Sequence, residues 1–298
     1  MSDVRLSAEE TSLLLQGFRI PPRQEMLAKL AKMLAQRDSS LEDLTALIVN
    51  DAGLASSVLK TVNSPLYGGN EKIASVGHAL EILGRENLAN LVAGLSIRTL
   101  SQDQPVKMER FMDTARDVAR ISAYLAGKIP GVRADDAYTL GLFHDCGMAV
   151  MIQRYPDYKG LLQKANKTSS ASLLRMEEAR FNTNHAVISY LVGRCWHLPE
   201  HICQVMLVHQ DSDVFTRAGE KNYSEEVLTL TAILRMAIYF SHSNRHLEDA
   251  NDWIAVRDDV MNYLGLTEAE FSDLEADVKE KAISGELTDW SDRAGSRS

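Results

Sequence analysis

Apolar residues recur at helical spacing along most of this chain, and this period constrains its fold more than any other feature. Leu27, Leu30, Ala31 and Leu34 occupy positions i, i+3, i+4 and i+7, so they share one face of a helix. The same spacing recurs in three later stretches, 44–48, 111–125 and 227–238. Period-two alternation is hard to find, which argues against strands. We therefore expect an all-α fold of roughly a dozen helices with short connections.

Residues that favour helix starts and stops mark several helix boundaries. The serines at 39–40 precede a helix predicted from Leu41, whose first turn is acidic. A stop is predicted just before Pro65, because a residue that precedes proline is pushed out of the α region. Thr267 and Glu270 have the spacing of a capping box, which predicts the start of a final helix.

The overall charge argues against a nucleic-acid or membrane-surface role. Acidic residues number 41 and basic residues 32, so the net charge is −9, whereas polyanion-binding proteins usually carry a basic face. The three cysteines, Cys146, Cys195 and Cys203, are too few for a disulfide framework and fit a reducing compartment. No signal peptide and no apolar run of about 18 residues is visible. We expect a cytoplasmic protein that does not bind membranes.

His144 and Asp145 are adjacent in the apolar run AYTLGLFHDCGMAVM, which predicts one helix with His144 on its inward face. A buried carboxylate is costly unless it is paired or bound to a cation. Imidazole and carboxylate together suit Zn, Mn or Fe. A simpler interpretation is a buried histidine hydrogen-bonded to a neighbour, with Asp145 paired to an arginine.

Two further histidines stand at the edges of apolar helical segments. His185 begins the run HAVISYLV, and His209 ends the run HICQVMLVH. Helical bundles build metal sites from inward histidines and carboxylates on facing helices. Four candidate metal ligands can therefore converge: His144, Asp145, His185 and His209. The sequence alone leaves open whether they meet.

A second cluster has the spacing C-x-H-x3-H-x-C and consists of Cys195, His197, His201 and Cys203. This is not the spacing of the usual zinc sites, and Pro199 interrupts the helix within it. Core cysteines and helix-capping histidines explain the cluster more simply. The chain also lacks a P-loop, a G-x-G-x-x-G and a G-x-S-x-G motif, which removes the main sequence support for nucleotide cradling and serine catalysis.

Several segments match one family when they are taken together. They are IPPRQEMLAKLAKML, LEDLTALIVNDAGLASSVLKTVNSPLYG, IASVGHALEILGRENLANLV, AYTLGLFHDCGMAVM and HAVISYLVGRCWHLPEHI. The elements NSPLYG and W-x-LP are specific in combination. The chain resembles HDOD domains, the HD-related output domains of bacterial signalling proteins.

The resemblance implies an HD-like orthogonal bundle of many helices, with two helical halves packed together. The HDOD domain is expected over residues 18–212, with its halves at 18–105 and 106–212. The rest of the chain is expected to form an N-terminal helical extension (1–17), a C-terminal helical extension (213–284) and a disordered tail (285–298).

The resemblance also implies an incomplete metal site. HD hydrolases bind metal through an early His, the His-Asp pair and a late Asp. In this chain the early position falls near Thr114 and the late position near Ile238, and the lysine that often follows the pair is Met148. The loss of one neutral and one anionic ligand weakens the case for a hydrolytic metal, and the loss of the lysine removes a cation that can stabilise a phosphoryl transition state.

These features imply a non-catalytic signal-transduction module with a degenerate HD-type site. We expect it to act on another signalling protein in trans or to bind a small ligand. The sequence leaves open whether it forms a homodimer. No cofactor is expected. The alternative is a metal-dependent phosphohydrolase or phosphodiesterase with a single divalent ion: Zn, Mn, Fe or Mg. A nucleic-acid-binding regulator is a third interpretation, which the net charge opposes.

Overall fold

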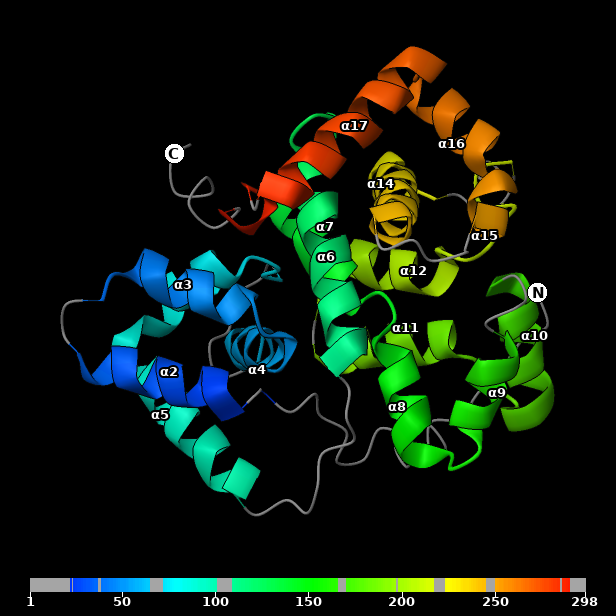
Figure 1. Cartoon of the computed structure of the whole chain (residues 1–298). Coiled ribbons are helices and arrows are strands. Elements are labelled where there is room, and N and C mark those ends of the chain that lie inside the picture. Colours follow the sequence, from blue (N-terminus) through cyan, green and yellow to red (C-terminus); the bar gives the residue numbers. More distant parts are fainter. Residues whose placement is uncertain are drawn as a thin grey trace.

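The computed structural model describes residues 22, 24–36, 39–64, 72–100, 109–165, 170–196, 198–216, 223–244, 250–284 and 286–289. Helices alone make up the secondary structure of these residues, so the expected all-α fold class is confirmed (Figure 1). The expected N-terminal extension over 1–17 lies outside the described residues. So does the part of the NSPLYG element from Pro65 onward.

The first half of the fold contains four helices. They are α2 (Gln24–Ala35), α3 (Leu41–Val49), α4 (Ala52–Val62) and α5 (Val76–Leu100). The α5 helix contacts the other three, so it organises this half (Figure 1). It consists of two helical pieces that meet at Gly84, where φ is 68°. That left-handed backbone conformation favours glycine, because other side chains are strained there.

The second half contains the helices that carry the candidate site. They are α6 (Glu109–Ala126), α7 (Ala134–Phe143), α8 (Cys146–Arg154), α9 (Tyr158–Ala165), α10 (Ser170–Phe181), α11 (His185–Cys195) and α12 (Glu200–Val208). Two packed groups hold this half together: α6 lies along α7, and α11 lies against α8 and α12. The site lies where these groups meet.

The helices after residue 222 pack onto the second half. They are α14 (Glu225–Asn244), α15 (Ala250–Ile254), α16 (Arg257–Leu264), α17 (Glu268–Ser284) and the 3-10 helix η1 (Glu286–Asp289). The α14 helix contacts α6, α7 and α12, and the later helices surround it (Figure 1). Of the tail expected from residue 285, the described part is η1, which packs on α17 and α6.

Direct hydrogen bonds join the two halves. The Tyr138 hydroxyl donates to the carbonyl of Val49 at 2.5 Å, and the Thr139 hydroxyl donates to the carbonyl of Ala74 at 2.7 Å. Both donors are on α7, the helix that ends at the His-Asp pair. The first half is therefore attached to the helix that positions the candidate site.

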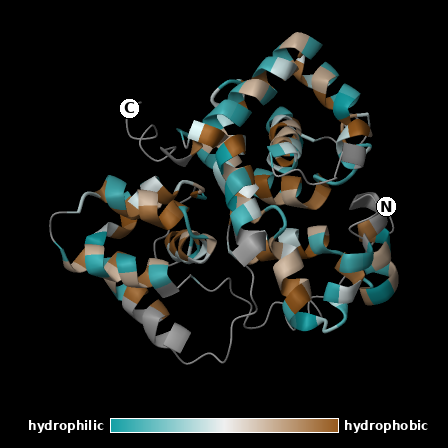
Figure 2. Ribbon diagram, in the orientation of Figure 1, coloured by the Kyte–Doolittle hydropathy of each residue, from teal (hydrophilic) through white to brown (hydrophobic). Residues whose placement is uncertain are grey.

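The sequence signals for helix ends agree with the structure. Ser40 caps α3 in a reciprocal capping box with Asp43. The α4 helix ends at Val62, and the Thr267 hydroxyl and backbone pair with Glu270 at the start of α17. Apolar helix faces turn toward one another in the interior (Figure 2). None of the helices in the described ranges combines the length and apolar character needed to cross a membrane.

Candidate functional site

The His-Asp pair lies at a break between two helices, so the prediction of one continuous helix over AYTLGLFHDCGMAVM is wrong. The α7 helix ends at Phe143 and α8 begins at Cys146. Asp145 has φ −106° and ψ 18°, which is not helical. Adjacent residues of one helix point about 100° apart. The break instead brings the side chains of His144 and Asp145 to the same place.

Two glycines beside the break permit close helix packing. A Cβ atom on Gly141 would lie 2.6 Å from the Cα of Ala119 on α6. A Cβ atom on Gly147 would lie 2.0 Å from the carbonyl oxygen of His185 on α11. Neither position can hold a larger residue unless the backbone of a neighbouring helix moves. The glycines thus draw α7 and α8 against the helices that complete the site.

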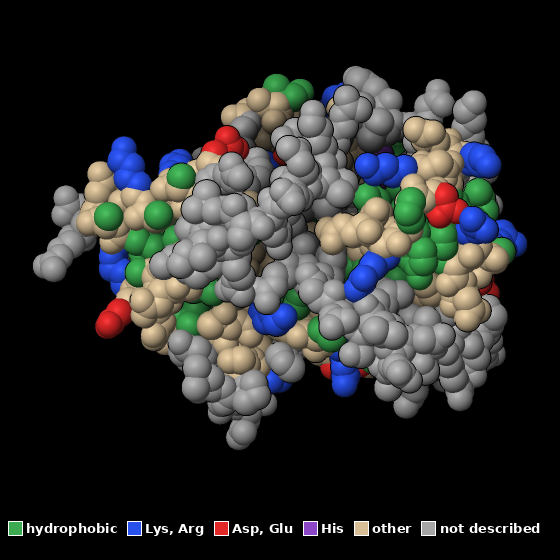
Figure 3. All heavy atoms as spheres, turned by 90° about the horizontal axis from the view of Figure 1, so that it is seen from below, with side chains coloured by type: hydrophobic (Ala, Val, Ile, Leu, Met, Phe, Trp, Pro, Cys, Tyr) green, Lys and Arg blue, Asp and Glu red, His purple; other side chains and the backbone are tan. Residues whose placement is uncertain are grey.

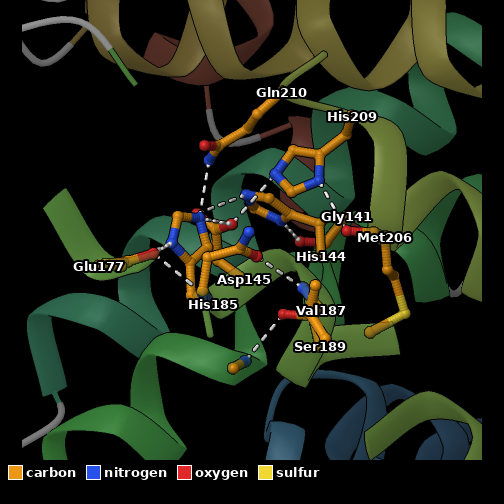
Figure 4. Close-up of polar contacts among 12 residues, drawn as sticks. Gly141, His144, Asp145, Glu177, His185, Val187, Ser189, Met206, His209 and Gln210 are labelled. Atoms are coloured by element: carbon orange, nitrogen blue, oxygen red, sulfur yellow. Dashed lines mark hydrogen bonds and ion pairs between the residues drawn. The ribbon is translucent and has the colours of Figure 1, made fainter. Parts of the chain in front are cut away.

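Three of the four predicted candidate ligands, the histidines, converge on the carboxylate of the fourth, Asp145 (Figure 4). The Nε2 atom of His209 lies 3.1 Å from Oδ1, and that of His144 lies 3.2 Å from Oδ2. The Nε2 atom of His185 lies 3.7 Å from Oδ1. All three histidines are buried, and the Asp145 side chain is 20% exposed. The four come from three places in the chain: the α7–α8 break, α11 and the end of α12.

The outer ring nitrogens of two histidines bond to backbone carbonyls. His144 Nδ1 donates to the carbonyl of Gly141 at 2.9 Å, and His209 Nδ1 donates to the carbonyl of Met206 at 3.0 Å. Each bond spans three residues within the helix that the histidine ends. These bonds fix the ring orientation and direct Nε2 toward Asp145.

Glu177 on α10 holds the third histidine, and no pattern in the sequence marked this residue. Its fully buried carboxylate accepts hydrogen bonds from His185 Nδ1 at 2.7 Å and from the His185 backbone N–H at 3.0 Å. The Tyr158 hydroxyl on α9 also donates to it. Glu177 differs from its neighbour Glu178 in being fully buried. This difference depends on how α10 packs, so the residue type alone does not reveal it.

Gln210 is the second site residue that sequence reasoning missed. Its side-chain amide nitrogen donates to His185 Nε2 at 2.9 Å, so the inner nitrogen of this ring is already engaged (Figure 4). Its Oε1 is buried and has no hydrogen-bond partner. In the sequence, the place of Gln210 directly after His209 is the one feature that could have marked it as a site residue.

The electrostatics of the cluster favour an ionised Asp145. Burial alone raises the pKa of this carboxyl, but His144 and His209 hold it well below its usual range. Burial lowers the pKa of His144, yet the charge and hydrogen bond of Asp145, together with the bond to the Gly141 carbonyl, raise it by more. Burial lowers the pKa of His185, but the hydrogen bond and charge of Glu177 and the charge of Asp145 together raise it by more. For His209, burial prevails and lowers the pKa. The cluster therefore holds one partly buried carboxylate anion among three buried imidazoles.

The donor set fits a single divalent ion in part. Ligand atoms of His144, Asp145 and His209 all lie within 4.8 Å of one another. The outer ring nitrogens of His144 and His209 donate to backbone carbonyls, as the outer nitrogens of metal-binding histidines do. His185 would join them only after Gln210 releases its Nε2. Residues able to bind a metal are thus present, with three donors available directly.

The positions where HD hydrolases carry the two further metal ligands and the lysine are occupied in this chain by residues of other types. Thr114 is half-buried on α6, and Ile238 packs against the apolar core from α14. Met148, in the lysine position, also packs against that core from α8. These three side chains offer no imidazole, carboxylate or ammonium group to the cluster.

The second cysteine–histidine cluster does not form a joint site among its described members. Cys195 is exposed at the end of α11, whereas Cys203 is buried and contacts the carbonyl of Leu198 at 3.7 Å. His201 turns instead toward Asp136, whose Oδ2 lies 3.4 Å from its Nε2. His197 lies outside the described residues.

Fold and site together define an HD-type helical domain of the signal-transduction class. The family profile of the HDOD domain matches residues 20–212. The chain therefore belongs to the HDOD domain family, within the HD superfamily.

The comparisons with individual proteins give distant relatives. An uncharacterized protein of Treponema pallidum is 25% identical over 194 residues, which is 64% of this chain and 38% of that protein. The chain thus spans less than half of that relative's length. The MmoQ response regulator of Methylococcus capsulatus superposes with a TM-score of 0.67, at 19% identity, over 87% of this chain and 98% of the other.

A further solved structure shares the fold. It is a virulence factor of Campylobacter jejuni, which superposes with a TM-score of 0.61 at 17% identity, over 92% of this chain and 99% of the other. At such identities the solved structures establish the common fold alone.

Proposed function

We propose that this chain is a non-catalytic signal-transduction module in which the His-Asp cluster is a structural and ligand-responsive centre. The observation that carries this proposal is the set of contacts that Asp145 makes with three imidazoles. Its two carboxylate oxygens are shared among three imidazoles, and Gln210 occupies the inner nitrogen of His185. A hydrolytic metal needs an open coordination position and a fixed set of ligands.

The same contacts explain what the cluster does without catalysis. It joins α7, α8, α11 and α12 at one point, and through Glu177 it reaches α10. A small ligand that changes one of these contacts would change how several helices pack. The module would then pass its state to another signalling protein in trans, either as a monomer or as a homodimer, in the cytoplasm.

Nucleic acid is not the proposed partner. The net charge is −9. On the described part of the face in Figure 3, Lys and Arg side chains are scattered between apolar and other groups and form no continuous stripe. Nucleic-acid binding depends on clustered positive charge.

A metal-dependent phosphohydrolase is the second candidate, because His144, Asp145 and His209 present three ligand atoms within 4.8 Å of one another. In that case these three residues would hold the ion, and the ion would supply an activated water. Gln210 would have to swing away before His185 could become a fourth ligand.

The two candidates differ in turnover. Purified protein is stripped of metal, reloaded separately with Zn, Mn, Fe or Mg, and assayed with phosphomonoester, phosphodiester and cyclic dinucleotide substrates. Our proposal expects no turnover above the Asp145→Asn variant with any ion. Metal-dependent turnover that this substitution abolishes would establish the hydrolase and overturn the proposal.

A further inference from the structure

Arg235 is an unusual arginine in the middle of α14. Its Nε atom is buried and has no hydrogen-bond partner. One of its terminal nitrogens, Nη2, donates to the backbone carbonyl of Asp211 at 2.7 Å. Within the described residues, this is the hydrogen bond that its guanidinium makes, although the group carries five N–H donors.

Other described arginines use their donors more fully. Arg180 and Arg194 each pair with a carboxylate, Asp157 and Glu200 respectively. Arg85 has no such pair, but it donates to several backbone carbonyls around Ser39. Arg235 is half-buried as a residue, but its Nε atom is fully buried and has neither kind of partner. It forms no ion pair with a carboxylate of the described residues, although the charges of Asp211 and Asp252 raise its pKa.

A buried N–H group of a charged guanidinium that has no acceptor is energetically unfavourable. Burial lowers the pKa of Arg235 to about 10, and the charges of Asp211 and Asp252 offset this only in part. An oxyanion that accepted hydrogen bonds from Nε and a terminal nitrogen would supply both the missing charge and the missing acceptor. Planar guanidinium groups match phosphate in this two-point manner.

The position of Arg235 connects it to the His-Asp cluster. The carbonyl that it binds belongs to Asp211, two residues after His209. Between them stands Gln210, which binds His185 and also has an unpartnered buried oxygen. The guanidinium thus lies at the end of α12, where the chain leaves the cluster.

We propose that Arg235 is the anchor of a binding site for a phosphate-type oxyanion beside the His-Asp cluster. The inference rests on the proposed function, because the anion is a regulatory ligand and not a substrate. Occupancy would change how Arg235 holds the backbone carbonyl of Asp211 and, through the adjacent Gln210, would act on His185. The fixed guanidinium provides the positive charge that a metal ion provides in a hydrolytic site.

The competing role for Arg235 is purely structural. Basic side chains near helix C-termini bind the last carbonyls and offset the helix dipole. Such a role explains the bond to Asp211 but leaves the buried Nε without a partner. It also predicts no response to phosphate.

The test measures thermal stability of the full chain in EDTA against increasing inorganic phosphate, with chloride keeping the ionic strength constant. A ligand that binds the folded state raises the melting temperature in a saturable way. We expect a saturable rise for the wild type and for Arg180→Gln, an exposed arginine that serves as the control. The rise should be lost in Arg235→Gln.

Arg235→Lys covers the case in which the glutamine variant fails to fold. Lysine keeps the charge but lacks the two-point donor geometry. We expect the apparent phosphate affinity to fall by on the order of tenfold. No saturable rise in the wild type, or an equal rise in the Arg235 variants, overturns the site. Because turnover is measured separately, phosphate binding together with metal-dependent hydrolysis would overturn the proposed function and leave this site standing.

Discussion

Replacing Gly147 by alanine tests how closely α8 must approach α11 beside the His-Asp pair. A Cβ atom at this position would lie 2.0 Å from the carbonyl oxygen of His185 and 2.7 Å from the backbone nitrogen of Ser189. Ordinary van der Waals contacts are 3.4–4 Å, so the carbonyl oxygen of His185 is more than 1 Å too close, and no rotamer change can move these backbone atoms. The two helices must separate to make room.

The expected destabilisation follows from opposing effects. Overpacking of a well-packed interior costs about 1–3 kcal/mol and occasionally more. Separation of the helices also weakens the hydrogen bond from Gly147 N–H to Ser189 Oγ, which is 2.8 Å long and contributes about 1 kcal/mol. Alanine returns up to about 1 kcal/mol of helix propensity. We expect a net loss of about 3 kcal/mol.

Urea denaturation followed by circular dichroism measures this loss. Gly160→Ala on α9 is the matched control, because a Cβ atom there would have no neighbour within 4 Å. The control should be neutral or stabilised by up to about 1 kcal/mol. If Gly147→Ala lies within about 0.5 kcal/mol of the wild type, the close approach that builds the site is refuted.

Three further predictions concern single side chains. Glu177→Gln should lower the free energy of unfolding by about 2 kcal/mol and lower the pKa of His185 in an NMR titration; an unchanged pKa would contradict the pairing. Burial lowers the pKa of His201, but the hydrogen bond and charge of Asp136 and the charge of Glu226 together raise it by more, so the stabilisation from these contacts is complete below about pH 6.5 and is lost as pH rises through the raised value. His201→Gln should flatten this part of the curve of melting temperature against pH. An unaltered curve would contradict the contribution of His201 to the pH dependence of stability. Ser40→Ala should cost about 1 kcal/mol in urea denaturation, because α3 loses its capping box; a cost near zero would show that the cap is not needed.

Local signals in the sequence were sufficient for much of the fold. The start of α3 after Ser40 and the capping box at Thr267 depend on side chains within four residues of each other. The helical period likewise reports which face of a helix is apolar. The break between α7 and α8 could not be read in this way, because apolar residues continue through it and the kink at Asp145 is set by packing.

The candidate site was predicted only in its innermost residues. The sequence marked His144, Asp145, His185 and His209 by residue type, and the structure brings them together. It did not mark Glu177, which is one of two adjacent glutamates. Its role depends on the packing of α10 over α11, which is a long-range property. Contacts of this kind leave no periodic pattern in a single sequence.

The stability of Asp145→Asn in the absence of metal tests the central claim most directly. If the cluster is a structural centre, its carboxylate holds three buried imidazoles, and removal of the charge should cost about 3 kcal/mol in urea denaturation with EDTA present. Asp157→Asn, in an exposed pair with Arg180, is the control and should change stability by less than about 1 kcal/mol. A catalytic metal site would behave in the opposite way, because its acidic ligands are kept for function at the expense of stability. Metal-free Asp145→Asn protein that is as stable as the wild type, or more stable, would contradict the account.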